Sequence, residues 1–550
     1  MKKKLVSLLL VAVMALSVCA CGAEKKQESS AAPSKSEAPA ASSSAAASSD
    51  AAAEEYVPTY PIVDEPITVK GLVVGKDTST REDRITWNKV EEVTGINIEW
   101  EVIDADSLAT YMAGNDWPDF FQHGFSTSMV NDYGVTGGRF VNFNEYLEYM
   151  PNLVQTMEDY PIARGAITEV NGEIYRLPYV EVAATSTGNN RPYLRTDVLE
   201  AAGLEMPTTI DEFYNCLKVL KEKNGVPSFI PSLTTYWGPI LFAAFGTETE
   251  LTFDAGADNK VYTNYTSEQM RLYLEFMNKL YEEGLIHQEF LTLDGTVKLE
   301  EAKSGKVAFI GGGVGNSLQA TDFADGEFHL DCNVPLTSEY DSTQTLNGYV
   351  GINTNAAIVI NKDSEYVEEL CKMMDIMFAT EEVVEGSGLH GVSFCYGIEG
   401  EQWSYNPDGK TYEFHTPEKY GGANATYQYA EVIWSNSGRC DGLAGLTTST
   451  IGNSYYRQQG FVNNVIPYQE ADLFPIGWMK FTEDEQYVID NKRADIESYV
   501  KEMQGKFVTG VADIDADWDT YCKTLEQMGI NDLIEVYQSS YDRWVESMAE

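Results

Sequence analysis

Apolar and polar positions change period several times along residues 67–121. The segment 67–74 is apolar and β-branched, which predicts a buried strand, whereas apolar residues occupy alternate positions of 96–103, as in a half-buried strand. Between them, apolar residues fall near one face of a helix that Gly95 ends. A short helical stretch then leads to a further strand at 117–121. This order predicts a mostly parallel sheet covered by helices.

Later helices carry clear start signals. Capping boxes predict the starts of two helices, at Thr209 with Glu212 and at Thr266 with Gln269, and a glycine ends each helix. After Asp363 a strand pattern changes to a helix pattern, whose methionines and cysteine we expect in the core. The body therefore has the alternating strands and helices of an α/β protein.

The first residues have the layout of a secretory signal, in which lysines precede an apolar stretch at 5–18 and small residues follow. The stretch is shorter than the roughly 20 apolar residues of a transmembrane helix. Around Cys21 the chain resembles a bacterial lipobox, whose cysteine is acylated and becomes the mature N-terminus. Residues 1–20 are thus predicted to be a lipoprotein signal peptide, and the alternative is an ordinary cleaved signal.

The tract after this cysteine is rich in Ser, Ala and Pro with scattered charge. It offers too little apolar surface to offset the entropy of ordering it. We therefore expect residues 21–57 to comprise the lipidated Cys21 and a disordered tether. The lipid anchor is then the sole contact of the protein with the membrane.

Composition excludes some partners. The formal net charge is -47, from 85 acidic and 38 basic residues, so the surface repels phosphate backbones and nucleic acid is not an expected partner. Hydrophobic residues make up 43% and aromatic residues 12% of the chain, which is typical of a globular protein with many rings. The other cysteines form no close-paired motif, which leaves open whether any of them pair.

Local signatures of catalysis and metal binding are missing. The glycine-rich segment 311–317 lacks the lysine of a phosphate-binding loop and is interpreted as a tight turn. Residues 513–524 resemble a calcium loop, but Trp518 and Thr524 replace the required Gly and Glu, so we expect a capped helix that Gly529 ends. No catalytic residue, metal or cofactor is predicted. Paired carboxylates for glycoside hydrolysis stay open because they leave no fixed spacing.

Aromatic and amide residues gather in three segments interpreted as loops, at 185–193, 233–246 and 429–440. Each sets Trp or Tyr beside Asn, Ser, Thr or Arg. Sugars need this mixture, because a pyranose has an apolar C–H face that packs on a ring and hydroxyls that require hydrogen bonds.

With these segments in place, the chain resembles the extracellular solute-binding lipoproteins of bacterial ABC importers, of the family-1 type that binds oligosaccharides. The resemblance is carried by segments in a matching order along the body, namely 87–100, 111–122, 170–179, 191–213, 305–315, 348–370 and 530–544.

The resemblance implies a two-lobed, type II periplasmic-binding-protein-like fold. Each lobe is a mostly parallel sheet flanked by helices, and the lobes close by hinge motion. We assign residues 58–182 plus 352–400 to lobe 1 and residues 183–351 plus 401–550 to lobe 2.

The resemblance also implies a function. The protein captures a carbohydrate in the cleft between the lobes and delivers it to the permease subunits of an ABC transporter, as a lipid-anchored monomer on the extracellular face of the cell membrane. It is expected to bind its ligand and not to be an enzyme. Because ligand loops lie at the carboxyl ends of strands, the candidate ligand-binding residues are His123, Tyr193, Tyr236, Trp237 and Trp434.

Three alternatives remain at this point. The first is a surface glycoside hydrolase, and the second is a binder of peptide or another polar solute on the same fold. The third is an adhesion or scaffold protein without a small ligand.

Overall fold

The structure of the 550-residue chain is a computed structural model. It describes residues 56–74, 84–122, 125–181, 191–233, 237–246, 253–256, 258–344, 346–347, 358–407, 411–415, 438–440, 447–448, 453–470 and 477–549. The chain divides into two units, Met1–Glu54 and Glu55–Glu550, and every described residue belongs to the second. The predicted signal peptide, Cys21 and the tether up to residue 55 lie outside the described residues.

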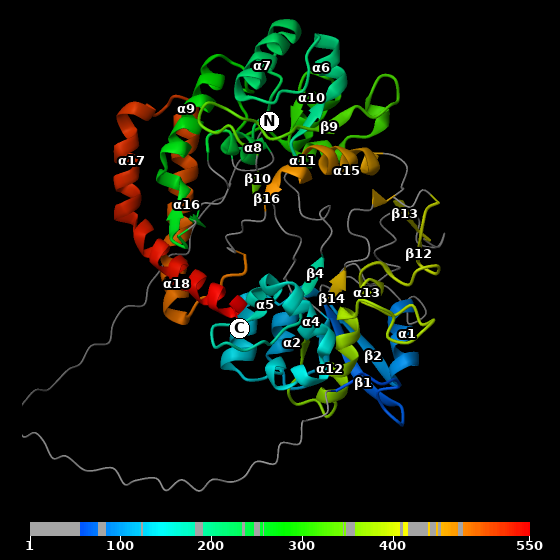
Figure 1. The fold of residues 1–550 in the computed structure, drawn as a ribbon. Helices are drawn as coiled ribbons and strands as arrows, with labels where there is room; N and C mark the ends of the chain where they lie inside the picture. Colours follow the sequence, from blue (N-terminus) through cyan, green and yellow to red (C-terminus); the bar gives the residue numbers. More distant parts are fainter. Residues whose placement is uncertain are drawn as a thin grey trace, which may run out of the picture. The chain divides into compact units, whose positions relative to one another are not determined.

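The first sheet has four strands in the order β11-β3-β1-β2. Its strands are β1 (Ile67–Val74), β2 (Ile96–Ile103), β3 (Phe120–Gln122) and β11 (Ile358–Ile360). β1 pairs in parallel with both β2 and β3, and β11 runs antiparallel to β3. Figure 1 shows β1 and β2 beside one another. The strands predicted from the apolar pattern are confirmed, and so is the mostly parallel sheet.

Short helices accompany this sheet. They are α1 (Ile85–Thr94), α2 (Leu108–Met112), α3 (Thr127–Val130), α4 (Pro151–Asp159), α5 (Pro161–Ile167), α12 (Val367–Asp375) and α13 (Ser393–Tyr396). Gly95 ends α1 in a left-handed conformation with φ of 79°, as its place after the apolar stripe predicts. The predicted core positions of α12 are also confirmed, since Cys371, Met373 and Met374 are buried.

The second sheet is three-stranded and antiparallel, in the order β8-β5-β9. The mostly parallel sheet expected in each lobe is therefore wrong for this sheet. Its strands are β5 (Tyr193–Arg195), β8 (Phe309–Ile310) and β9 (Leu330–Cys332). The helices that follow β5 in the chain are α6 (Thr196–Ala202), α7 (Ile210–Asn224), α8 (Trp237–Ala243), α9 (Glu268–Glu282), α10 (Gly295–Lys303) and α11 (Gly312–Ser317). Those of the C-terminal part are α15 (Asn453–Asn464), α16 (Glu483–Val508), α17 (Ile514–Met528) and α18 (Ile530–Ala549).

Three strand pairs and one three-stranded sheet are also present among the described residues. They are β6 (Phe253–Ala255) with β7 (Val261–Thr263), β10 (Leu346–Asn347) with β16 (Gln469–Glu470), β4 (Tyr179–Glu181) with β14 (Gly438–Cys440), and β13 (Thr411–Phe414) with β12 (Trp403–Tyr405) and β15 (Thr447–Thr448). β12 and β13 are antiparallel, as in a hairpin, and residues 408–410 between them lie outside the described residues.

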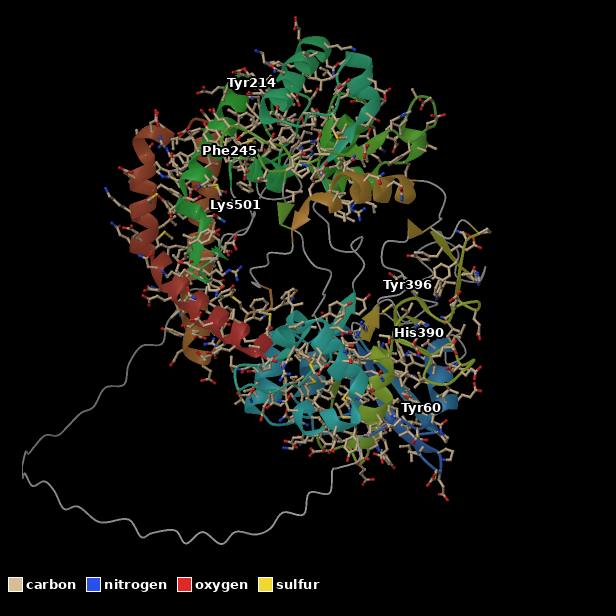
Figure 2. All side chains as sticks on the ribbon, viewed as in Figure 1. Tyr60, Tyr214, Phe245, His390, Tyr396 and Lys501 are labelled. Carbon is tan, nitrogen blue, oxygen red and sulfur yellow. The ribbon has the colours of Figure 1, made fainter. Side chains whose placement is uncertain are left out.

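Two large hydrophobic cores hold the body. The core beside the first sheet contains Val69, Phe120 and Ile358, and it draws its buried residues from 69–177 and 358–394. The core beside the second sheet draws most of its buried residues from 193–346 and 461–544. Figure 2 shows the side chains that fill both, and it labels Phe245 of the second core, whose ring packs against Phe276 of α9 at 5.7 Å.

Two of the predicted helix starts differ in detail from the structure. The Thr209 hydroxyl accepts the N–H of Glu212, as predicted, but the Glu212 carboxylate returns to the N–H of Thr208. The second box is wrong by one residue, since Ser267 caps α9 by accepting the N–H of Met270 at 3.1 Å. In both cases a neighbouring residue with a hydroxyl side chain, Thr208 or Ser267, takes part in the cap.

Two other segments test the interpretation of motifs. The glycine-rich segment 311–317 is not a tight turn, because Gly312–Ser317 forms helix α11. The calcium-like segment is a capped helix, as predicted: Asp513 accepts the N–H of Ala516, and Gly529 ends α17 with φ of 93°. The tight-turn interpretation was wrong because it relied on local glycine content alone. The packing around this helix involves other parts of the chain and does not show in the local sequence.

A buried carboxylate makes the first core sensitive to pH. Asp375, 1% exposed, accepts the N–H groups of Asn152 and Leu153 at the start of α4. Burial raises the pKa of Asp375 to about 7, above the roughly 3.9 of an unfolded Asp. At pH values between these two pKa values, folded Asp375 keeps a proton that the unfolded chain has lost. The free energy of unfolding therefore falls as pH rises through this range.

We expect this carboxylate to lower the free energy of unfolding by about 1.4 kcal/mol from about pH 6 to about pH 8. Urea unfolding at both pH values measures it. The Asp375→Asn variant should lose this part of the pH dependence, whereas Glu365→Gln, an exposed carboxylate before α12, should keep it. An equal slope in wild type and Asp375→Asn would contradict the assignment.

Candidate functional site

A pocket with a volume of about 600 Å³ lies at the carboxyl end of β8. Phe229 forms parallel bridges with Phe309 of β8 and with Ile286, so the segment ending at Ile230 runs in the same direction as β8. The residues that follow both segments, Pro231 with Ser232 and Gly311, line the pocket. In α/β proteins ligands bind at the carboxyl ends of strands, which makes this pocket the candidate site.

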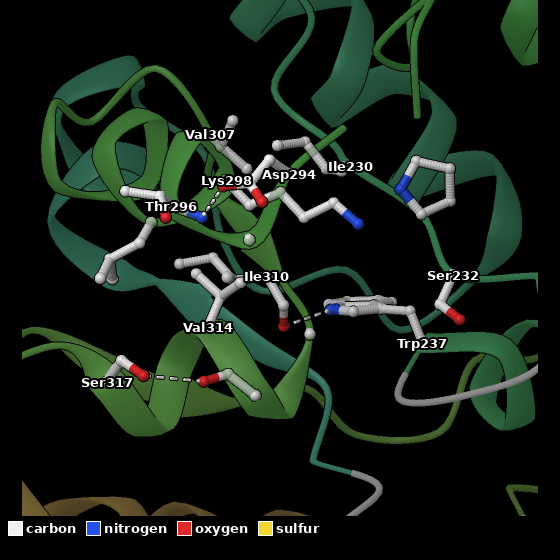
Figure 3. Close-up of a pocket in the computed structure, with 15 residues that line it drawn as sticks. Ile230, Ser232, Trp237, Asp294, Thr296, Lys298, Val307, Ile310, Val314 and Ser317 are labelled. Atoms are coloured by element: carbon white, nitrogen blue, oxygen red, sulfur yellow. Dashed lines mark hydrogen bonds between the residues drawn. The ribbon is translucent and has the colours of Figure 1, made fainter. Parts of the chain in front are cut away.

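One wall of the pocket is the start of α10 (Figure 3). Asp294 caps this helix by accepting the N–H of Thr296 at 2.8 Å, and this hydrogen bond lowers the pKa of the Asp294 carboxyl. Figure 3 shows the Lys298 side chain reaching into the cavity from the same helix. Asp294, Gly295 and Thr296 are exposed and so form the rim. The rim thus offers hydrogen-bond acceptors and donors close together.

The opposite wall carries the indole of Trp237, the first residue of α8 (Figure 3). The ring is 1% exposed and stacks on Phe213 at 5.3 Å with an interplanar angle of 23°. Its N–H donates to the carbonyls of Tyr193 and Ile310, both at 3.2 Å. Trp237 therefore supports the pocket wall from within the core, and its indole N–H is already occupied.

Tyr193 lies behind the same wall. Its ring is 0% exposed, and its hydroxyl donates to the Asn316 side chain at 2.9 Å. Burial raises the pKa of this hydroxyl. A Cβ at Gly315 would come within 2.1 Å of the Tyr193 ring, so the glycine is needed for α11 to pack there. Tyr193 and Trp237 are therefore brought together, joined by the indole hydrogen bond.

The other predicted ligand residues are His123, Tyr236 and Trp434, and all three lie outside the described residues. Their role as ligand contacts stays a prediction. Tyr236 directly precedes Trp237 in the chain.

Several residues that line the pocket were not predicted from the sequence. They include Ile230, Ser232, Asp294, Thr296, Lys298 and Val314. The signal that points to Ser232 and Val314 is their position just after a parallel strand segment. Nothing local marks α10, because an N-cap aspartate followed by a short polar helix is common on protein surfaces.

One group of side chains elsewhere has the composition of a metal site. Ligand atoms of Asp325, Glu327 and His329 lie within 4.8 Å of one another. His329 Nε2 and Asp325 Oδ2 are already paired at 2.7 Å, and both carboxylates are exposed. We assign no metal role to this group.

Within the described ranges, no helix has the length and apolar character needed to span a bilayer. A family model for bacterial extracellular solute-binding proteins matches residues 77–384, more than half of the chain. The chain belongs to this family. The matched range contains the second sheet, strands β2, β3 and β11 of the first sheet, and the candidate pocket of this solute-binding protein.

Curated relatives of this solute-binding protein extend over most of its length. The fructooligosaccharide ABC transporter substrate-binding protein FusA of Streptococcus pneumoniae is 22% identical over 520 residues, which cover 88% of this chain and 92% of FusA. Lipoprotein LipO of Bacillus subtilis is 24% identical over 424 residues, covering 74% of this chain and 75% of LipO.

Solved structures share the fold. An HMO-binding, ABC-transporter-associated solute-binding protein from Bifidobacterium longum infantis aligns with a TM-score of 0.67 at 19% identity, covering 88% of this chain and 99% of that one. Streptococcus pneumoniae FusA in complex with kestose aligns with a TM-score of 0.62 at 20% identity, covering 87% and 100%. The predicted fold class, the α/β fold of type II solute-binding proteins, is confirmed.

Proposed function

We propose that the chain is the substrate-binding lipoprotein of an ABC import system, which captures an oligosaccharide and delivers it to a membrane permease. The pocket at the carboxyl end of β8 carries the proposal. Its volume of about 600 Å³ lies in the usual range for small-molecule sites. It combines the apolar side chains of Ile230, Ile310 and Val314 with hydroxyl, carboxylate and ammonium groups. A sugar needs both kinds of surface.

Relatives give independent support. Two of them are named for fructooligosaccharide transport and for the binding of melibiose, raffinose and stachyose. The family consists of extracellular solute-binding proteins, which agrees with a binder and not an enzyme. The acidic composition, with a net charge of -47, disfavours nucleic acid as the ligand.

In this proposal the two lobes close on the ligand. Every residue that lines the first pocket belongs to lobe 2, so the ligand's contacts with lobe 1 are themselves part of the proposal. The lobes are residues 58–182 with 352–400 and residues 183–351 with 401–550. The distribution of buried residues supports this division, since one core draws on 69–177 and 358–394 and the other mostly on 193–346 and 461–544. A ligand that contacts both lobes shifts the equilibrium toward the closed form by the difference between its binding free energies for the closed and the open form.

The remaining parts of the proposal concern place and assembly. The protein acts as a monomer on the extracellular face of the cell membrane, anchored through a lipid on Cys21. LipO, a relative named as a lipoprotein, supports the anchor. His123, Tyr236 and Trp434 are proposed to contact the sugar, and Tyr193 and Trp237 to support the pocket wall.

A thermal-shift screen against mono- and oligosaccharides tests the proposal. A ligand present at about 100 times its dissociation constant adds about 2.7 kcal/mol to the stability of the native state. We expect an oligosaccharide to raise the unfolding midpoint and to be recovered intact after prolonged incubation.

Other outcomes would replace the proposal. Sugar products in the recovered sample would show a glycoside hydrolase. Stabilisation by charged peptides but not by sugars would show a different ligand, and no stabilisation by any small solute would favour a scaffold protein.

A further inference from the structure

A second pocket, of about 230 Å³, shares no residue with the first. One side of it is the chain that leaves α5, where Gly165 and Glu169 line the pocket. The other side combines Lys480 with Arg543 and Trp544 of α18. The pocket therefore lies where the first third of the chain meets its last helix.

The buried charges beside this pocket do not balance. The side chains of Glu169, Arg176 and Lys480 are 2%, 4% and 8% exposed. Arg176 Nη2 lies 3.0 Å from Glu169 Oε1, and Lys480 Nζ lies 3.4 Å from the same oxygen. Two buried cations thus share one carboxylate, which leaves one positive charge without a buried counter-charge.

The other charged groups do not supply the missing negative charge in the interior. Arg543 is matched by Glu485, with Nη1 at 2.9 Å and Nη2 at 2.5 Å from its carboxylate oxygens. Glu546 also lines the pocket, but it is exposed, so water screens its charge. In the described part of the chain, Lys480 has no ion-pair partner besides Glu169.

Hydrogen-bond donors are also in excess, because two buried donors but only one buried acceptor, Glu169 Oε1, lack a hydrogen bond among the described residues that line the pocket. The Nε–H of Arg543 and the indole N–H of Trp544 are buried and have no acceptor within the described residues. Trp544 is 8% exposed. A buried donor without an acceptor is costly, and in native proteins it usually marks a bound water or ion. A group that carries acceptors and negative charge would satisfy both these donors and the Lys480 ammonium.

We propose that this second pocket binds a small oxyanion, of the carboxylate or phosphate class, between Lys480 and the side chains of Arg543 and Trp544. The pocket is large enough for about seven waters, at about 30 Å³ each, or for such an anion with part of its hydration shell. Because its walls come from the α5 region and from α18, the bound anion ties these parts together. This inference is independent of the sugar proposed for the first pocket.

Thermal unfolding of the full-length chain tests it, in sodium acetate and in sodium phosphate, each against sodium chloride at equal ionic strength and neutral pH. We expect acetate or phosphate to raise the midpoint by about 2 °C or more over chloride. Which salt acts at the lower concentration distinguishes a carboxylate ligand from phosphate.

Variants separate a site from a general salt effect. Lys480→Gln should abolish the shift, whereas Lys492→Gln, which removes a lysine paired with Asp532, should keep it. Trp544→Phe removes one unpaired donor without changing charge and should weaken anion binding about tenfold by titration calorimetry. This variant remains informative if Lys480→Gln does not fold.

The proposal is overturned if neither anion differs from chloride. It is also overturned if Trp544→Phe and Lys480→Gln respond as the wild type does. Gly295→Trp, in the first pocket, should keep the anion response whether or not it binds sugar.

Discussion

Replacing Trp237 with alanine should lower the free energy of unfolding by about 3–5 kcal/mol. The indole is 1% exposed and packs against Phe213, Phe309 and Phe229 at ring distances of 5.3, 5.2 and 5.9 Å. Its loss leaves a cavity in the second core and also removes the donor to two backbone carbonyls. Urea unfolding of wild type and variant measures the change.

This expectation differs from what the sequence suggests for Trp237. An aromatic residue in a polar loop is expected to serve as a stacking platform, and its removal would then leave the fold intact. In the structure it begins helix α8 and lies in the core. Tyr487→Ala, at a ring that is 71% exposed, is the control and should barely change stability. Equal midpoints for Trp237→Ala and wild type would show that the ring is not a core residue.

Placing a tryptophan at Gly295 should weaken oligosaccharide binding about 100-fold or more without unfolding the protein. Gly295 is the first residue of α10 and lines the first pocket. A Cβ added there meets no atom within 4 Å, so the backbone tolerates a side chain. An indole at the rim then takes space that the ligand needs, and a 100-fold loss corresponds to about 2.7 kcal/mol.

The chain provides a matched control for this variant. Gly477 is also exposed, an added Cβ there meets no atom within 4 Å, and it does not line the pocket. Gly477→Trp should therefore bind as the wild type does. Circular dichroism and thermal midpoints of both variants should match the wild type, which separates lost binding from lost structure. Equal weakening in both variants would show that the pocket is not the site.

Elements with strong local signals were predictable. The strand at 67–74 and the helix ended by Gly95 follow from the period of apolar residues and from a residue free to adopt a positive φ. These signals lie within a few residues of the element that they describe. The parallel arrangement follows from their order, because a strand, a helix and a second strand connect most simply in parallel.

Helices α8 and α11 were not predictable for the opposite reason. α8 begins with Trp-Gly-Pro, which is typical of a loop, but Ile240 and Leu241 are buried in the second core. The glycines of α11 lower its helix propensity, yet one of them, Gly315, lies against the ring of Tyr193. Packing between distant segments overrides local preference at both places.

The candidate pocket was partly predictable. The rule that ligands bind at the carboxyl ends of strands, together with a Trp in an amide-rich segment, leads to Trp237. Asp294 and Lys298 reach the same pocket from another helix, and no local pattern links them to β8. The burial of Trp237 in the pocket wall could not be predicted either, because it depends on contacts with distant residues such as Phe213 and Phe309.

The most direct test of the account is a calorimetric titration of the best oligosaccharide from the screen into the full-length wild type and the two glycine variants. The account predicts one site per chain in the wild type and in Gly477→Trp, with similar dissociation constants, and binding about 100-fold weaker or absent in Gly295→Trp. Equal affinities in all three proteins, or no oligosaccharide that binds the wild type, would contradict it.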